Sequence, residues 1–342
     1  MQVERTPEPV EWARESSRPG TRVFRLVESG LRLVDAGMSL KRIDHMTSGR
    51  DDAVTPTATA VILCAFETVE GESRWAVKFY EHSVDGARKL ARHASILRGL
   101  AGRLPVPGII RVFESGDVFG LPVLITTAEG YTLCAKSETA SAENLRRWVE
   151  SLADALSSLH AVEPASLGLE IRDEAAMASE AGQMFRDDAV WYAKHASAVG
   201  QEFRGILREG VEILSSVEPA CDRACICHRD LTAYNAIIHD GRVHAIIDWD
   251  HCGVAAASED VAKAMLGLMV TLKRPWGSRA PLVSRFLKRY SDNTGLDLST
   301  LIVNAVPYFL DAGMDWLVGV KNAPAEELAG ALRFALDLRV SG

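Results

Sequence analysis

The 342-residue sequence lacks the features that would place it in a membrane, outside the cell or on nucleic acid. No stretch approaches the ~18 consecutive apolar residues that a membrane-spanning helix needs. The N-terminus, Met-Gln-Val-Glu-Arg-Thr-Pro, has charges and a proline where a signal peptide needs an apolar run. Basic residues are in deficit, with 38 Lys and Arg against 46 Asp and Glu. We therefore expect a cytoplasmic protein with no membrane or nucleic-acid partner, although a small cationic substrate is compatible with this charge.

Cysteines are few, and no C-x-x-C pair is present. Of the six, only Cys221, Cys225 and Cys227 lie close together in the sequence. With His228 they suggest zinc as one interpretation, because thiolate and imidazole are common zinc ligands. His228 fits better in the loop motif described below, so buried, reduced thiols are the favoured interpretation.

The pattern of apolar residues indicates two lobes of different character. Strands are predicted at 59–67, 74–80, 109–113 and 121–126, with one helix at 85–101, which describes a small antiparallel sheet and a helix. From about residue 141 the pattern is mainly helical, and helices are predicted at 172–216, 258–272, 280–292 and 300–338. The predicted fold class is α+β and bilobal: a loose arm at 1–20, a first lobe at 21–126 and a second lobe at 127–342.

One segment of the second lobe carries most of the functional information. It contains His228-x-Asp230-x-x-x-x-Asn235, then two apolar runs on either side of Asp240-Gly241, then Asp248. Asp-Gly between apolar runs predicts a two-residue hairpin, because both turn positions need a positive φ. Such a hairpin places Asp248 opposite Ala233. The sequence therefore predicts that Asp230, Asn235 and Asp248 meet at one end of a rigid ribbon.

These residue types suit phosphoryl transfer, which depends on positioning and on charge neutralisation. Mg²⁺ prefers oxygen ligands, and Asn235 and Asp248 can supply them. Asp230 is the candidate catalytic base, which accepts the proton of an attacking hydroxyl. His228 is assigned to the catalytic loop, where it orients the other residues. Asp250 either touches a second metal ion or solvates the loop.

Over roughly residues 40–340 the sequence resembles the aminoglycoside phosphotransferase family, kinases of antibiotics and other small molecules with a bilobal protein-kinase-like fold. Ala76-Val-Lys78 resembles the strand whose lysine holds the nucleotide phosphates, and 123–130 resembles the hinge that binds adenine. The resemblance implies nucleotide binding by Lys78 and by main-chain groups of Thr126, Thr127 and Ala128. It also implies ATP and Mg²⁺ as cofactors, with GTP not excluded. Asp260, in Ser-Glu-Asp-Val-Ala, matches an acid that is usually structural.

Three features depart from the family pattern. The loop at 46–60 has only Gly49 and no G-x-G-x-x-G, so hydroxyls and main-chain N–H groups would have to cover the phosphates. His93 stands where a helix glutamate would pair with Lys78, so another acid such as Glu81 would have to take that part. The metal motif is Asp248-Trp-Asp250, where Asp-Phe-Gly is usual.

The sequence favours a small-molecule acceptor over a protein acceptor. Only 11 residues separate Asp248 from Asp260, and no Ala-Pro-Glu is present, so there is no room for a long activation segment. We expect a monomer or homodimer that phosphorylates a hydroxyl of a small molecule, most simply an aminoglycoside-like antibiotic. The alternatives are a metabolite kinase (choline, homoserine, methylthioribose or sugar type) and a nucleotide-binding pseudokinase. Acids and aromatics available for substrate are Asp173, Glu174, Glu180, Asp187, Asp188, Asp311, Asp315, Trp191, Tyr192, Tyr308 and Trp316.

Overall fold

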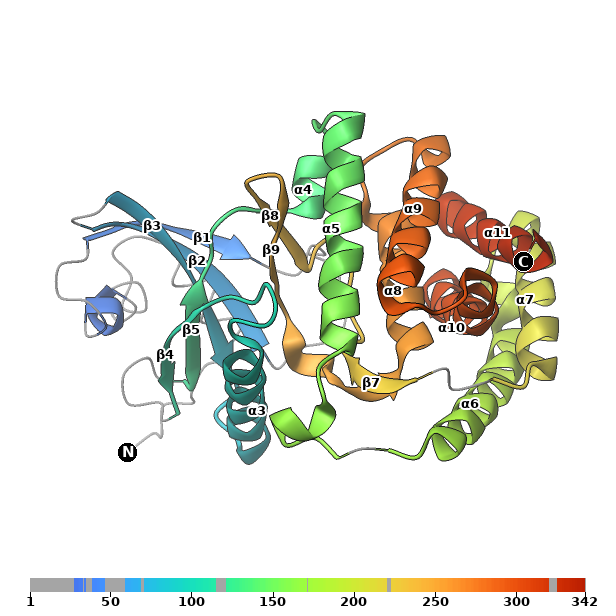
Figure 1. The fold of residues 1–342 in the computed structure, drawn as a ribbon, viewed down its shortest axis with the longest axis horizontal. Coiled ribbons are helices and arrows are strands. Elements are labelled where there is room, and N and C mark those ends of the chain that lie inside the picture. Colours follow the sequence, from blue (N-terminus) through green and yellow to red (C-terminus); the bar gives the residue numbers. More distant parts are fainter. Residues whose placement is uncertain are drawn as a thin grey trace. The chain divides into compact units, whose positions relative to one another are not determined.

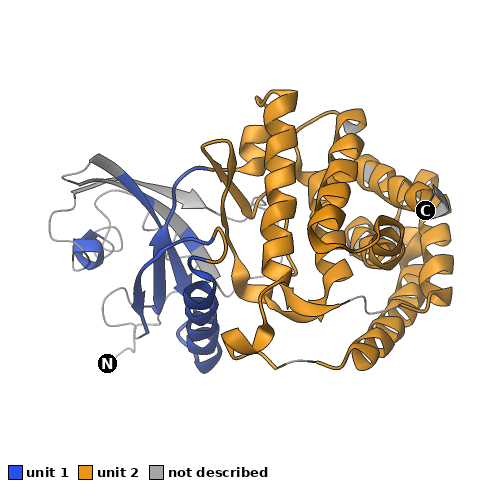
Figure 2. Cartoon of the chain, in the orientation of Figure 1, with its two compact units in different colours: residues 1–102, 106–130 blue, residues 103–105, 131–342 orange. Residues whose placement is uncertain are grey.

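The computed structural model describes residues 28–32, 34, 39–46, 59–68, 71–114, 121–170, 172–219, 223–319 and 325–341. The arm predicted at residues 1–20 and most of the loop predicted at 46–60 lie outside the described residues. The chain forms two compact units: residues 1–102 with 106–130, and residues 103–105 with 131–342 (Figure 2).

The first unit is built on a five-stranded antiparallel sheet in the order β1-β2-β3-β5-β4 (Figure 1). β3 is the central strand, and Val77 and Phe79 within it are fully buried. The first strand was not predicted from the sequence. The strands are β1 (Ser39–Met46), β2 (Thr59–Thr68), β3 (Gly71–Tyr80), β4 (Ile109–Phe113) and β5 (Val123–Thr127).

Helix α3 (Val84–Leu100) packs on this sheet and begins at a defined cap. The Ser83 hydroxyl accepts a hydrogen bond from the Gly86 N–H, which satisfies one of the free donors of the first turn. The sequence predicts an apolar stripe of Leu90, Ala94, Leu97 and Ala101 on this helix. The first three are buried, whereas Ala101 is exposed at the C-cap.

The second unit is mainly helical. The two long helical stretches predicted at 172–216 and 300–338 are each a pair of helices. In Figure 1, α5 lies beside α9, and α10 packs against α8 and α11. The helices are α4 (Leu133–Ser137), α5 (Ala142–His160), α6 (Glu174–His195), α7 (Arg204–Ser216), α8 (Ala257–Thr271), α9 (Trp276–Thr294), α10 (Leu298–Gly319) and α11 (Ala325–Ser341).

Among the described residues, one helix is apolar and long enough to cross a membrane by length and composition. This is the window Leu298–Val318 in α10, with a mean hydropathy of 1.2, and 67% of it is buried inside the structure. Phe309, Leu310 and Met314 are among its fully buried side chains. The helix is packed as a core helix of this unit.

Two small sheets contain strands within and on either side of the segment from His228 to Asp248. One pairs β7 (Ala224–Cys227) with β10 (Gly253–Ala256), and the other has the order β6 (Tyr131–Thr132), β8 (Ala236–His239), β9 (Arg242–Ile246). β8 and β9 form the predicted hairpin, and its turn residues Asp240 and Gly241 have φ of 47° and 76°. Both values are in the left-handed region that such a turn requires.

The predicted register of this hairpin was wrong by one residue beyond the turn. His239 pairs with Arg242 as expected, but the pairing shifts between Ile237 and Ile238, so that Ala236 lies opposite Ile246. The irregularity adds one residue to the β9 side, as a β-bulge does. Asp248 is therefore not placed opposite Ala233.

Helix α8 approaches the catalytic loop so closely that one position requires glycine. A Cβ on Gly267 would lie 2.7 Å from Thr232 Cα and 3.2 Å from the Leu231 carbonyl oxygen. Both contacts are to backbone, which cannot rotate away. The loop and the helix can keep this spacing only without a side chain at 267.

We predict that Gly267→Ala lowers the free energy of unfolding by about 1–3 kcal/mol, since overpacking forces the backbone to shift. Gly205→Ala in α7 is the matched control, because a Cβ there meets nothing within 4 Å. Urea denaturation of both variants measures the effect. Equal stability of the two variants would show that the close approach is not a constraint.

Candidate active site

Asp230 and Asn235 are held together in the loop that follows β7. The Asn235 amide nitrogen donates to the Asp230 carbonyl oxygen at 2.7 Å and to Asp230 Oδ2 at 3.0 Å. Because the NH₂ group faces Asp230, the amide orientation is fixed and its oxygen Oδ1 points the other way. That oxygen is the atom a hard cation would use.

Asp248 follows β9 in a left-handed conformation, with φ of 65° and ψ of 63°. A non-glycine residue in this region costs on the order of 1–3 kcal/mol, and such strain is often found at functional sites. The residue between β9 and Asp248 is hydrogen-bonded to the loop, because the Ile247 N–H donates to the Asn235 carbonyl at 2.9 Å. Asp250 is half-buried in the next short turn, Trp249–His251.

Burial and nearby charges shift the pKa of the Asp230 carboxyl. Burial raises its pKa above the ordinary value, His228 opposes the shift, and the negative charge of Asp248 adds to it. The two carboxylates are therefore close enough to interact. A raised pKa makes a carboxylate a stronger proton acceptor, as a general base requires.

His228 is completely buried and has both ring nitrogens occupied. Its Nε2 donates to the Ile247 carbonyl at 2.9 Å, and its Nδ1 accepts from the Asp230 N–H at 3.3 Å. Its ring meets Trp249 edge-on, with centroids 4.7 Å apart. These contacts connect the loop with the segment after β9, so the side chain orients the site.

Asp260, at the start of α8, braces the same loop from behind. Its two carboxylate oxygens accept from the main-chain N–H groups of His228 at 2.6 Å and Arg229 at 2.7 Å. His160, at the end of α5, lies 3.2 Å from Asp260 Oδ2, and the Tyr290 hydroxyl lies 2.6 Å from its other nitrogen. Burial would raise the pKa of Asp260, but His160 and the loop outweigh it, so the pKa is lowered.

Arg229 is the strained residue of this brace. Its φ is 66°, and its guanidinium donates to Glu259 at 2.8 Å. The acid that pairs with this arginine, Glu259, lies on α8 beside Asp260. The segment after Asp248 is correspondingly short, and it returns through β10 to pair with β7.

The residues predicted to bind nucleotide lie in the first unit. Lys78 is 8% exposed near the end of β3, and its ammonium lies 5.7 Å from the centre of the Tyr80 ring. His93 is also buried, and its Nδ1 lies 2.8 Å from the Tyr80 hydroxyl. The histidine that replaces the expected glutamate is thus part of the interior of this unit.

Two of the main-chain N–H groups in the predicted hinge already donate hydrogen bonds within the first unit. The Thr127 N–H donates to the Gly108 carbonyl at 2.9 Å, and the Ala128 N–H donates to the Arg74 carbonyl at 3.0 Å. Thr126 is 8% exposed in the last part of β5. Both of those N–H groups serve the sheet, so a purine edge at this segment would have to use carbonyl acceptors or a neighbouring residue.

A second acidic group joins α6 and α10. The Tyr192 hydroxyl donates to Asp311 Oδ1 at 2.9 Å. Burial and the charges of Asp188 and Asp315 raise the pKa of Asp311 to about 7, against opposition from Tyr192 and Lys263. Burial also raises the pKa of Asp188, with Asp315 adding to the shift. The carboxyl groups of Asp188, Asp311 and Asp315 therefore lie close enough together to raise the pKa of Asp188 and of Asp311.

The other acids considered from the sequence have local structural roles. Asp173 caps α6, Glu174 accepts from the Ala224 N–H, Glu180 pairs with Arg172, and Asp187 accepts from Gln183. Trp191 is 40% exposed and stacks on His195, while Tyr308 packs edge-on against Phe185.

A sequence model of the phosphotransferase enzyme family (APH) matches residues 65–298, which is more than half of the chain. The chain belongs to this family. The match includes Lys78, the hinge, the catalytic loop and Asp260. The family and the enzyme class predicted from the sequence, a small-molecule kinase, are confirmed. A comparison with curated proteins found no match.

Solved structures of such enzymes share the fold, at low sequence identity. Macrolide 2'-phosphotransferase MphH from Brachybacterium faecium is 16% identical, with a TM-score of 0.57 over 90% of this chain and 97% of its own. The GDP and kanamycin complex of APH(2")-IIia is 14% identical, with a TM-score of 0.55 over 92% and 99%. A thermostable mutant of APH(4)-Ia, in a complex with ADP and hygromycin B, is 16% identical, with a TM-score of 0.51 over 93% and 97%. The predicted α+β, protein-kinase-like fold is confirmed.

The sequence reasoning missed the partner of the bracing acid. His160 is not among the residues singled out from the sequence, and its contact with Asp260 spans 100 residues of sequence. A histidine at the end of an amphipathic helix carries little signal by itself. The buried position of Asp260, completely inaccessible to solvent, is what makes this contact necessary.

We predict that Asp260→Asn lowers kcat and also lowers the free energy of unfolding by about 3–5 kcal/mol. An amide offers one acceptor oxygen and turns N–H hydrogens toward a main-chain donor, so one contact to the loop is lost. The adjacent Glu259→Gln is the control, because glutamine keeps a side-chain oxygen that can accept from Arg229, whose side chain is 47% exposed while that of Glu259 is 18% exposed. Equal effects of the two substitutions on unfolding in urea would contradict the bracing role.

Proposed function

We propose that the chain is an ATP- and Mg²⁺-dependent O-phosphotransferase that phosphorylates a hydroxyl of a small cationic molecule, an aminoglycoside-like antibiotic. The observation that carries this proposal is the arrangement of Asp230, Asn235 and the strained Asp248 at the end of one hairpin. A cytoplasmic location, where ATP and Mg²⁺ are available, fits this role, and use of GTP is not excluded.

Asp230 is the residue that acts on the acceptor. Its carboxylate would receive the proton of the attacking hydroxyl and hold the oxygen in line with the γ-phosphate. The hydrogen bond from Asn235 fixes its orientation, and the contact between its N–H and His228 fixes its backbone. Burial raises its pKa, which makes the carboxylate a stronger proton acceptor.

The donor set at this site suits Mg²⁺. A carboxylate at Asp248 and the amide oxygen of Asn235 are hard ligands, and the amide is already turned so that this oxygen is not engaged by Asp230. When bound, the ion would neutralise charge on the transferred phosphoryl group. Asp250 is half-buried in the next turn and is a candidate for contact with a second ion.

The acidic group on α6 and α10 supports a cationic acceptor. A carboxyl with a pKa of about 7, crowded by two like charges, gains from a bound cation. An ammonium group placed among Asp188, Asp311 and Asp315 would remove that repulsion. Solved structures of the same fold are described with kanamycin and with hygromycin B, which supports this substrate class.

Asp230→Asn is expected to lower kcat by roughly 10²–10⁴-fold, because an amide cannot accept the proton. The affinity for nucleotide should stay nearly unchanged. Asp240→Asn, at the exposed hairpin turn, is the control, since asparagine tolerates its left-handed backbone. Coupled ADP release with an aminoglycoside acceptor measures kcat, and retention of half the wild-type rate would refute the assignment of the base.

Asp311→Asn is expected to lower kcat/KM for a polycationic acceptor such as kanamycin by roughly tenfold or more, through KM. The KM for ATP should not change, and Asp187→Asn is the control on the outer side of α6. The ratio of wild type to variant should grow as pH rises from 6 to 8, because Asp311 ionises near pH 7 and is neutral below it. A ratio independent of pH would exclude Asp311 from acceptor binding.

The same assay separates this function from its rivals. A metabolite kinase would release ADP with choline, homoserine, methylthioribose or a sugar, and not with antibiotics. A pseudokinase would gain thermal stability with nucleotide but release no ADP with any acceptor. Mass detection of one added phosphate on the acceptor completes the test.

A further inference from the structure

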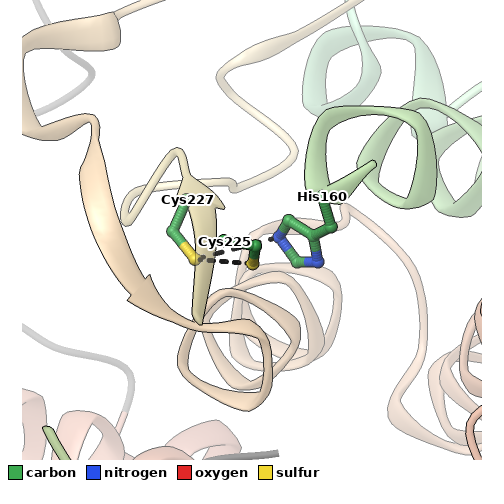
Figure 3. Close-up of side chains that lie close together, drawn as sticks. All are labelled: His160, Cys225 and Cys227. Atoms are coloured by element: carbon green, nitrogen blue, oxygen red, sulfur yellow. Dashed lines mark hydrogen bonds between the residues drawn. The ribbon is translucent and has the colours of Figure 1, made fainter. Parts of the chain in front are cut away.

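Behind the catalytic loop, three buried side chains form a group that the phosphotransfer chemistry does not use. Cys225 and Cys227 lie on the same face of β7, with their sulfurs 3.6 Å apart. His160 comes from the end of α5, and its Nε2 lies 3.9 Å from the Cys227 sulfur (Figure 3). The three ligand atoms lie within 4.8 Å of one another, and all three residues are buried.

We propose that Cys225, Cys227 and His160 form a binding site for a thiophilic d¹⁰ cation such as Zn²⁺. Zinc bonds of about 2.3 Å to sulfur and about 2.05 Å to nitrogen, at tetrahedral angles, require edges of about 3.8 Å between sulfurs and about 3.6 Å between sulfur and nitrogen. The observed separations of 3.6 Å and 3.9 Å match these edges. Two of the three edges therefore have the spacing of a zinc site, and the third, between the Cys225 sulfur and His160, lies within 4.8 Å.

The surroundings of the group also suit a metal ion. The Tyr290 hydroxyl lies 2.6 Å from His160 Nδ1, where it can accept that N–H while Nε2 binds the metal, the usual outer contact of a zinc-bound histidine. Asp260 Oδ2, 3.2 Å from Nε2, offers an oxygen for a fourth position. Small residues, Ala255 and Ala257, pack against the two cysteines.

Binding is balanced in charge and protons. The two thiols lose their protons to solvent, and the two thiolates balance the charge of Zn²⁺, which is far less costly to bury than an isolated ion. Asp260 keeps its own negative charge and its hydrogen bonds from the loop. The proton on His160 Nε2, which faces Asp260 in the structure, must also leave, and the imidazole then carries a single proton on Nδ1. His228, which follows Cys227 directly, takes no part, because its Nε2 donates to Ile247.

The test is the zinc content of the full chain, expressed with added Zn²⁺ and purified under reducing conditions. We expect about one Zn²⁺ per chain in the wild type and in Cys64→Ala, a buried thiol outside the group, and a loss of at least about tenfold in Cys225→Ala. Co²⁺ in place of Zn²⁺ should give a thiolate-to-cobalt charge-transfer band, which Cys225→Ala abolishes.

Tyr290→Phe keeps all three ligands and removes the outer contact, so Zn²⁺ affinity should fall by roughly 10–100-fold. Circular dichroism shows that each variant is folded, and this readout does not depend on zinc. Substoichiometric zinc in the wild type, or equal zinc in wild type and Cys225→Ala, would overturn the proposal. Because zinc content is measured without an acceptor, failure of the phosphotransferase assignment is a separate result.

Discussion

The site depends on one buried carboxylate. Asp260 has no solvent contact, and it accepts hydrogen bonds from two successive N–H groups of the catalytic loop. A charge in the interior is stable only when it is well hydrogen-bonded, so the loop and the start of α8 must stay together. That constraint keeps Arg229 in its left-handed conformation and sets the direction in which Asp230 leaves β7.

The same carboxylate connects elements far apart in the sequence. His160 from α5 contacts it, and Tyr290 from α9 contacts His160. Two helices that pack side by side are thus fastened to the loop through polar groups, while Gly267 lets α8 approach its backbone. Low-dielectric surroundings strengthen each of these hydrogen bonds, and they also make the loss of any one of them expensive.

Local signals in the sequence predicted the parts of the site that local chemistry decides. Asp240-Gly241 specified the hairpin because few other pairs accept two positive φ angles, and the stripe of α3 specified its buried face. The parts decided by distant contacts were not accessible. β7 and β10 are four residues each and form because they pair with one another. No sequence motif indicates the irregularity between Ile237 and Ile238, so the hairpin register predicted beyond it was wrong.

The candidate acids show why composition alone could not locate a binding surface. Most of them are engaged locally, in caps, ion pairs or contacts within a helix.

The pKa values of two carboxyl groups, Asp260 and Asp311, are shifted in opposite directions. Asp260 is the more deeply buried, yet its pKa is lowered, because two N–H groups and an imidazole stabilise the anion. Burial and two negative neighbours raise the pKa of Asp311 to about 7, although the Tyr192 hydroxyl and Lys263 oppose the shift. Hydrogen bonds from the protein therefore stabilise the ionised form of Asp260, whereas the surroundings of Asp311 oppose its ionisation.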